Sequence, residues 1–131
     1  ILFMSVFTAG IIIIGDEILS GRTKDTNGNF IAKNLISSGI KLEEIRVIQD
    51  NKAIIKESVK LFSDKYNYVF TTGGIGPTHD DITSESIAEA FDKDYKINSE
   101  AFKILEKYYS KGEFNTSRQK MSKMPTDVEL I

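Results

Sequence analysis

Cysteine is absent from the 131 residues, and histidine occurs only once. The lack of cysteine excludes disulfide bonds, thiolate zinc sites and cysteine nucleophiles, and it fits a reducing compartment. The formal net charge of −2 gives no electrostatic reason to expect a nucleic acid or an anionic membrane as a partner. We therefore expect a cytoplasmic domain whose partners are neither nucleic acids nor membranes.

The sequence also has no apolar segment as long as a membrane span. Its most hydrophobic part, residues 1–14, lacks a basic flank and runs directly into Gly15, so it is interpreted as a strand and not as a signal peptide. Residues 6–14 are rich in isoleucine without polar alternation. This pattern is typical of a strand covered on both faces, which indicates a parallel sheet.

Helical and strand patterns alternate along the rest of the chain. Further strands are predicted at residues 40–48 and 66–72, and another begins at 128–131. Helices are predicted at residues 25–38, 50–64 and 84–91, from 98 onwards, and more weakly at 114–124. The inner side of the first helix is assigned to Phe30, Ile31, Leu35 and Ile36. The alternation predicts an open α/β sheet covered by helices. We expect one domain over residues 1–131 that continues beyond residue 131 or is completed by another chain.

Acidic residues follow each of the three predicted strands. Asp16 and Glu17 follow the first, Asp50 follows the second, and Asp80 and Asp81 follow the third. Ligands of open α/β sheets bind beyond the carboxyl ends of the strands, so these side chains are expected to converge. Adjacent carboxylates beside a phosphate would repel it unless a cation lay between them. We expect Mg²⁺ or another divalent metal at Asp80 and Asp81, with Asp16 and Glu17 as further candidate ligands.

Each acidic residue also has a simpler interpretation. Asp50 or Asn51 can cap the helix after the second strand, and Asn98 or Ser99 can cap the helix from residue 98 onwards. Asp80 can be merely solvated. Either Asp81 or Thr83 can cap the next helix. The two acidic residues after the first strand can be a polar strand end.

The stretch TTGGIGPTHDDIT at residues 71–83 is the second candidate feature. Gly73 and Gly74 allow backbone N–H groups to approach a ligand, and the helix that follows favours an anion. The loop matches neither a Walker A motif nor GxGxxG, so it can also be a plain turn between strand and helix. His79 lies in it, but no nucleophile elbow accompanies this histidine.

A third group opens the first predicted helix. Asp25, Thr26 and Asn27 can cap that helix or provide an anion or hydroxyl site. Arg22 and Lys24, just before them, are candidates for phosphate contact.

Three segments resemble the molybdopterin-binding domain family. They are GDEILSGRTKDTN at 15–27, VIQDN at 47–51 and TTGGIGPTHDDITSESIAEAF at 71–91. Their form is similar to that of CinA competence/damage-inducible proteins and the N-terminal part of FAD synthases. The resemblance implies a three-layer α/β/α sandwich with a mostly parallel sheet, and it implies self-association.

The resemblance also implies roles for individual residues. Asp50 and Asp81 match the catalytic positions of the family. Asp16 and Glu17 match positions where nucleotide and metal contacts are expected. The residues implied to contact a pterin or nucleotide phosphate are Gly15, Asp25, Thr26, Asn27, Gly73, Gly74, Gly76 and Thr83.

For the CinA-like branch the resemblance implies a metal-dependent pyrophosphatase acting on ADP-ribose or FAD. Adenylylation of molybdopterin is the alternative, although Ile75 and the segment 77–81 depart from the adenylyltransferase pattern. A non-catalytic module that binds a pterin or nucleotide is a further alternative.

Overall fold

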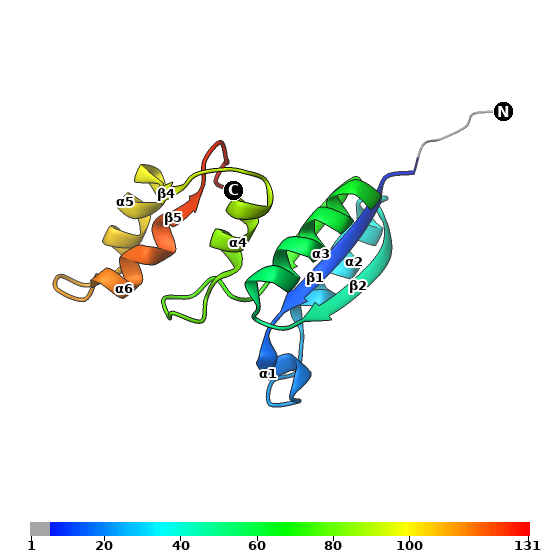
Figure 1. Cartoon of the computed structure of the whole chain (residues 1–131), viewed down its shortest axis with the longest axis horizontal. Helices are drawn as coiled ribbons and strands as arrows, with labels where there is room; N and C mark the ends of the chain where they lie inside the picture. Colours follow the sequence, from blue (N-terminus) through cyan, green and yellow to red (C-terminus); the bar gives the residue numbers. More distant parts are fainter. Residues whose placement is uncertain (1–5) are drawn as a thin grey trace.

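The computed structural model describes residues 6–131. Its main sheet has three parallel strands in the order β2-β1-β3, formed by β1 (Thr8–Ile14), β2 (Lys41–Ile48) and β3 (Tyr68–Thr72). Helix α2 (Asn27–Ser37) connects β1 to β2, and α3 (Lys52–Lys65) connects β2 to β3. Figure 1 shows these helices beside the sheet. The connection from β1 to β2 leads to one side of β1, and the chain then returns to place β3 on the other side. The switch point where such sheets bind ligands therefore lies between β1 and β3.

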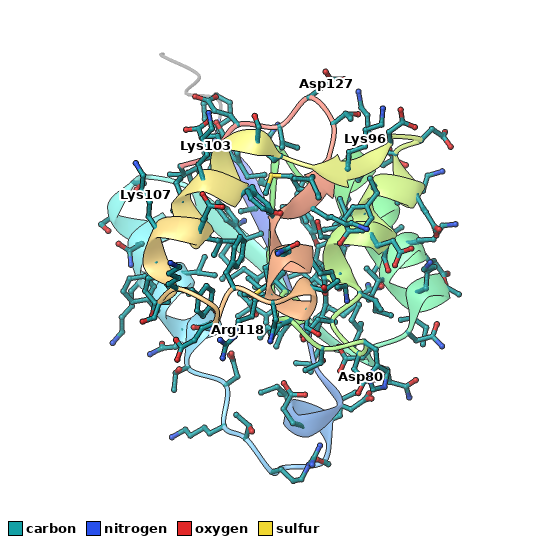
Figure 2. All side chains as sticks on the ribbon, turned by 90° about the vertical axis from the view of Figure 1, so that its left-hand side faces the viewer. Asp80, Lys96, Lys103, Lys107, Arg118 and Asp127 are labelled. Carbon is teal, nitrogen blue, oxygen red and sulfur yellow. The ribbon has the colours of Figure 1, made fainter. Side chains whose placement is uncertain are left out.

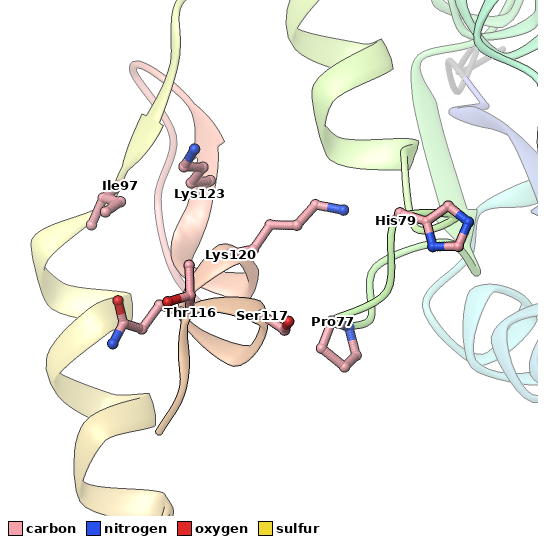
Figure 3. A pocket seen from close by; sticks show the side chains of 8 residues that line it. Pro77, His79, Ile97, Thr116, Ser117, Lys120 and Lys123 are labelled. Carbon is pink, nitrogen blue, oxygen red and sulfur yellow. The ribbon is translucent and has the colours of Figure 1, made fainter. Parts of the chain in front are cut away.

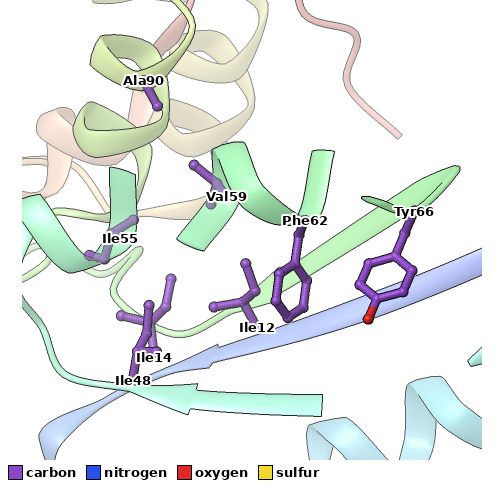
Figure 4. Packing of buried hydrophobic residues seen from close by; sticks show 8 residues of the cluster. All are labelled: Ile12, Ile14, Ile48, Ile55, Val59, Phe62, Tyr66 and Ala90. Atoms are coloured by element: carbon purple, nitrogen blue, oxygen red, sulfur yellow. The ribbon is translucent and has the colours of Figure 1, made fainter. Parts of the chain in front are cut away.

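The isoleucine run of β1 is buried on both faces, as predicted. Ile12 and Ile14 pack with Ile55, Val59 and Phe62 of α3, as Figure 4 shows. The alternate residues, among them Ile11 and Ile13, pack with Leu35 of α2 on the other face. Successive side chains of a strand point to opposite faces, so this single strand provides both cores. The predicted α/β/α class with a parallel sheet is confirmed.

A small lobe, residues 95–125, lies on the far side of α4 (Thr83–Ala90) from the sheet (Figure 1). The short strands β4 (Tyr95–Ile97) and β5 (Lys123–Pro125) pair antiparallel within it. Between these strands come α5 (Ser99–Tyr108), α6 (Thr116–Gln119) and the 3-10 turn η1 (Lys120–Ser122). Figure 2 views this lobe face on, with Lys103, Lys107 and Arg118 on its outer side. Cation–π contact with Tyr109 holds Arg118, whose Cζ lies 4.6 Å from the ring centroid.

Several predictions about the later part of the chain are wrong. Residues 114–124 do not form one helix, because α6 and η1 are short and β5 begins at Lys123. Residues 128–131 form no strand. The strand predicted from Tyr66 begins at Tyr68, since Tyr66 still ends α3 as its C-cap.

The predicted inner face of α2 is partly wrong. Phe30 is 69% exposed and Ile36 is 73% exposed, whereas Gly28 and Leu35 are buried. The helix therefore presents the face of Gly28 and Leu35 to the sheet, with Ile31 packed beside them. Between residues 6 and 131, no helix has the length and apolar character needed to cross a membrane.

Candidate functional site

Acidic side chains from three strand ends line one pocket of about 330 Å³. The pocket lies at the carboxyl ends of the strands, at the switch point between β1 and β3. We call it the carboxylate pocket, and its lining residues are Asp16, Glu17, Arg22, Asp50, Gly74, Thr78, Asp80 and Asp81. Five carboxylates and a single arginine therefore face a common space.

Two of the carboxylates hold each other's backbone. The Asp16 N–H donates to Asp50 Oδ2 at 3.0 Å, and the Asp50 N–H donates to Asp16 Oδ1 at 3.2 Å. Asp50 does not cap α3, because Asn51 does so by accepting the Ile54 N–H at 3.1 Å. Asp16 begins the short helix α1 (Asp16–Leu19), which the sequence did not predict. This pairing fixes both carboxylates where β1 and β2 end.

The glycine loop, residues 73–82, connects β3 to α4. Gly73 and Gly74 have positive φ values of 91° and 67°. A Cβ on Gly73 would collide with the carbonyl oxygen of Ile14, and one on Gly74 would collide with the hydroxyl of Thr83. Both glycines are therefore required by close packing and backbone conformation, before any ligand is considered.

Thr83 is placed inside the protein and not at the pocket wall. It is 1% exposed, and its hydroxyl donates to the Gly73 carbonyl at 2.9 Å. Its N–H donates to the Gly74 carbonyl at 3.0 Å. Helix α4 has no side-chain cap, so the prediction that Thr83 or Asp81 caps it is wrong.

Asp81 is held within the loop by Thr78. Its Oδ2 accepts the Thr78 N–H at 2.9 Å and the Thr78 hydroxyl at 2.7 Å. Burial alone would raise the pKa of Asp81, but the hydrogen bonds from Thr78 and Gly76 and the charge of Lys120 together lower it. Asp81 is thus an ionised carboxylate at neutral pH.

The neighbouring residues at the loop tip are far more exposed. The side chain of Asp80 is 77% exposed and that of His79 is 93% exposed. His79 Nε2 lies 3.2 Å from Asp80 Oδ1. The two adjacent aspartates therefore differ: Asp81 is anchored and Asp80 is a surface group at the pocket edge.

The residues at the start of α2 lie apart from the carboxylate pocket. None of the pocket-lining residues is Asp25, Thr26 or Asn27. The Asp25 carboxylate accepts the N–H groups of Asn27 and Gly28, each at 3.1 Å. Asp25 thus accepts the first two N–H groups of α2, whose N-cap residue Thr26 makes no side-chain cap hydrogen bond. Gly15 donates its N–H to the Ile48 carbonyl at 3.0 Å and so joins the ends of β1 and β2.

Among residues 6–131, no three acidic or histidine side chains are placed to hold a metal ion on their own. Mg²⁺ commonly takes only one or two carboxylates and completes its shell with water and phosphate oxygens. Asp16 Oδ2 and Asp50 Oδ1 accept no hydrogen bond within residues 6–131. These two carboxylate oxygens therefore have the chemistry of Mg²⁺ ligands. The metal and catalytic roles of these residues stay predictions.

Thr78 and Lys120 hold the glycine loop, but neither was predicted from the sequence. Thr78 precedes Asp81 by three positions, a spacing typical of reciprocal side-chain and backbone hydrogen bonds, so it could have been found. Lys120 reaches the loop from the small lobe, where its Nζ donates to the carbonyls of Thr78 and Asp81. Nothing in its local sequence indicates this contact.

The sequence of the chain matches a known protein family. Residues 10–128 match the family described as "Probable molybdopterin binding domain", and the chain belongs to this family. The resemblance seen in the sequence motifs is thereby confirmed.

Particular relatives show which branches the chain is similar to. It is 42% identical over 101 residues to a "Probable FAD synthase" of Caenorhabditis elegans, covering 77% of this chain and 20% of that protein. The crystal structure of CinA from Thermoplasma acidophilum matches with a TM-score of 0.86 at 32% identity, covering 92% of this chain and 72% of that one. MoaB from Pyrococcus furiosus, a tungsten cofactor synthesizing protein, matches with a TM-score of 0.62 at 27% identity, covering 86% and 68%.

The chain spans from about a fifth to about half of the length of the curated relatives it matches.

Proposed function

We propose that the carboxylate pocket binds the pyrophosphate group of a nucleotide such as ADP-ribose or FAD together with a divalent cation, and that the protein hydrolyses that group. The observation that carries the proposal is the lining of five carboxylates with one arginine. A pyrophosphate placed there without a cation would meet strong like-charge repulsion. When bound, Mg²⁺ or a similar ion would supply charge neutralisation and a water of lowered pKa.

The residues of the chain have separate tasks in this proposal. Asp16 and Asp50, fixed by their mutual hydrogen bonds, present oxygens to the cation at the end of β1 and β2. Asp81, ionised and anchored by Thr78, presents its carboxylate to the same pocket from the glycine loop that follows β3. A residue preorganised in this way loses no free energy to reorganisation during the reaction.

Arg22 is the cationic group available to the phosphate. Its Nε donates to the Ser20 hydroxyl at 3.3 Å, and its terminal NH₂ groups have no hydrogen-bond partner within residues 6–131. Guanidinium groups bind phosphate oxygens in pairs. Arg22 would thus orient the pyrophosphate and balance part of its charge.

The proposed reaction is a hydrolysis in which water is the only reactant besides the nucleotide. A water oxygen attacks one phosphorus, the bridging P–O bond breaks, and two phosphate monoesters leave. The proton of the water passes to a pocket carboxylate whose oxygen is not bound to the cation. ADP-ribose would give AMP and ribose 5-phosphate, and FAD would give AMP and FMN.

The similarity to a probable FAD synthase supports a nucleotide of this class as the ligand. Adenylylation of molybdopterin is the second candidate, and the likeness to MoaB favours it. Ile75 and residues 77–81 depart from the adenylyltransferase pattern, so hydrolysis comes first.

AMP release from ADP-ribose and FAD with Mg²⁺, Mn²⁺ or Co²⁺ tests the proposal. Asp81→Asn keeps an oxygen that can accept from Thr78 but removes the charge, so we expect kcat/KM to fall by about 100-fold or more. Asp64→Asn, at an exposed position on α3 that does not line the pocket, is the matched control and should leave turnover unchanged.

Three other outcomes would redirect the proposal. Unchanged turnover in Asp81→Asn would remove the role given to this residue. Pyrophosphate release from ATP that strictly requires molybdopterin would favour the transferase. Tight nucleotide binding without turnover under any of the metals would indicate a binding module.

A further inference from the structure

A single lysine joins the small lobe to the glycine loop. Lys120, the first residue of η1, donates its Nζ to the Thr78 carbonyl at 2.7 Å and to the Asp81 carbonyl at 2.9 Å. Within residues 6–131, no other residue of the small lobe forms a hydrogen bond to residues 73–82.

Lys120 is half-buried and lines the space between the loop and the small lobe. A hollow of about 520 Å³ separates the loop residues Pro77 and His79 from Thr116, Ser117 and Lys123 of the lobe. Figure 3 shows the Lys120 side chain extended from η1 toward the loop. Its amino group therefore connects the small lobe to the glycine loop.

Within the part of the chain that the structure describes, all other hydrogen bonds of the loop tip, residues 75–81, are internal to the loop. The Asp81 N–H donates to the Thr78 carbonyl at 3.2 Å, and Thr78 donates twice to the Asp81 carboxylate. At its base the loop is tied to Thr83. The carbonyls that Lys120 binds thus belong to the two residues that close the turn, and both of these residues line the carboxylate pocket.

We infer that Lys120 is a positioning residue: by holding the carbonyls of Thr78 and Asp81, it sets the Asp81 carboxylate against the carboxylates that follow β1 and β2. This inference rests on the proposed pyrophosphatase function. It makes the small lobe a part of the reaction machinery, although the lobe contributes no carboxylate to the pocket. An ammonium group has three donors and no acceptor, so it can hold two carbonyls at once.

We expect a large loss of rate when the Lys120 contact is removed, because the reaction depends on the position of the Asp81 carboxylate. A displacement of about 1 Å in a group that positions reacting atoms can cost about 100-fold in rate. Without the two hydrogen bonds of Lys120, the loop tip would be held only by the hydrogen bonds at the base of the loop and by those within the loop.

Three variants of the full chain test the inference. Lys120→Met keeps the aliphatic stem and removes the donors, and we expect kcat for ADP-ribose to fall by about 10- to 100-fold with KM changed less than about threefold. Lys120→Arg restores donors and should recover a large part of the loss. Lys123→Met removes a neighbouring charge that lines the same hollow but donates no hydrogen bond to the loop, and it should stay within about threefold of the parent protein.

A Lys120→Met protein with the parent's kcat would overturn the inference. Equal losses in Lys120→Met and Lys123→Met would overturn it as well, because general charge near the substrate would then be the cause. Circular dichroism and thermal melting establish that each variant is folded.

Amide hydrogen exchange separates this inference from the proposed function. The Asp81 N–H should exchange about tenfold faster in Lys120→Met than in the parent protein, because its acceptor, the Thr78 carbonyl, loses its outside support. If the parent protein hydrolyses no nucleotide, the proposed function fails, and this exchange rate alone decides whether Lys120 holds the loop. Equal exchange rates would show that it does not.

Discussion

Replacing Gly73 by alanine should destabilise the protein far more than the same replacement at Gly39. Both glycines have positive φ values, 91° at Gly73 and 74° at Gly39. The left-handed conformation costs an alanine about 1–2 kcal/mol at either position. Among residues 6–131, a Cβ at Gly39 meets nothing within 4 Å, whereas one at Gly73 collides with the backbone carbonyl of Ile14, at the end of the central strand.

The carbonyl of Ile14 cannot move freely, because β1 pairs with strands on both sides. Overpacking of this kind adds about 1–3 kcal/mol. Gly73→Ala should therefore lower the free energy of unfolding by about 2–5 kcal/mol, and Gly39→Ala by only about 1–2 kcal/mol.

Urea unfolding of the two variants, followed by circular dichroism and extrapolated linearly to water, measures the difference. Equal losses in the two variants would refute the explanation, since only backbone strain would then matter and the close approach to β1 would be irrelevant.

Other predictions concern the core, the acidic range of pH and a helix cap. Phe62→Ala, in the fully buried core, should cost about 3–5 kcal/mol in urea unfolding, whereas Phe30→Ala, on the exposed side of α2, should stay within about 0.5 kcal/mol of the parent. The hydroxyl of Tyr66, 2.7 Å from the carboxylate of Glu44, is the largest of the influences that hold the pKa of Glu44 below its ordinary value of 4.5. Because the folded pKa is the lower one, this stabilisation is complete above the unfolded value and disappears as pH falls through the folded value. Tyr66→Phe should thus lower Tm at neutral pH and flatten the acid fall of Tm in melting curves; a fall as steep as the parent's would contradict this. Asn51→Ala removes the cap of α3 and should cost about 1 kcal/mol by urea unfolding, and no loss would mean that the cap is dispensable.

The sheet was predictable because its signals are local. A run of isoleucine at 11–14 indicated a strand buried on both faces, and β1 is buried on both faces. Asn51 and Asn98 are placed before helices as sequence caps predict, and both accept backbone N–H groups in the structure. The strand order was not predicted, since β2 and β3 are consecutive in the sequence but lie on opposite sides of β1.

The small lobe was not predictable in the same way. Strands β4 and β5 have three residues each, and their pairing joins segments far apart in the sequence. Such strands are too short to show alternation, and their stability comes from contacts that no local pattern encodes. The exposure of Phe30 and Ile36 has a similar cause, since only packing decides which face of α2 meets the sheet.

The candidate site was predictable where it follows from topology. Carboxylates placed after three strands had to meet at one edge of a parallel sheet, and Asp16, Asp50 and Asp81 do line one pocket. The reciprocal pairing of Asp16 with Asp50 and the contact of Lys120 with the loop depend on side-chain geometry across distant segments. No sequence pattern contains that geometry.

The dependence of nucleotide binding on a divalent cation tests the central claim most directly. Isothermal titration of ADP-ribose into the protein, once with Mg²⁺ and once with EDTA, measures it without requiring turnover. Because five carboxylates face the pocket, we predict binding with Mg²⁺ and a loss of at least about 100-fold in affinity with EDTA. The same Kd in both titrations would contradict the account, because the pocket would then accept a pyrophosphate without the cation that its charge demands.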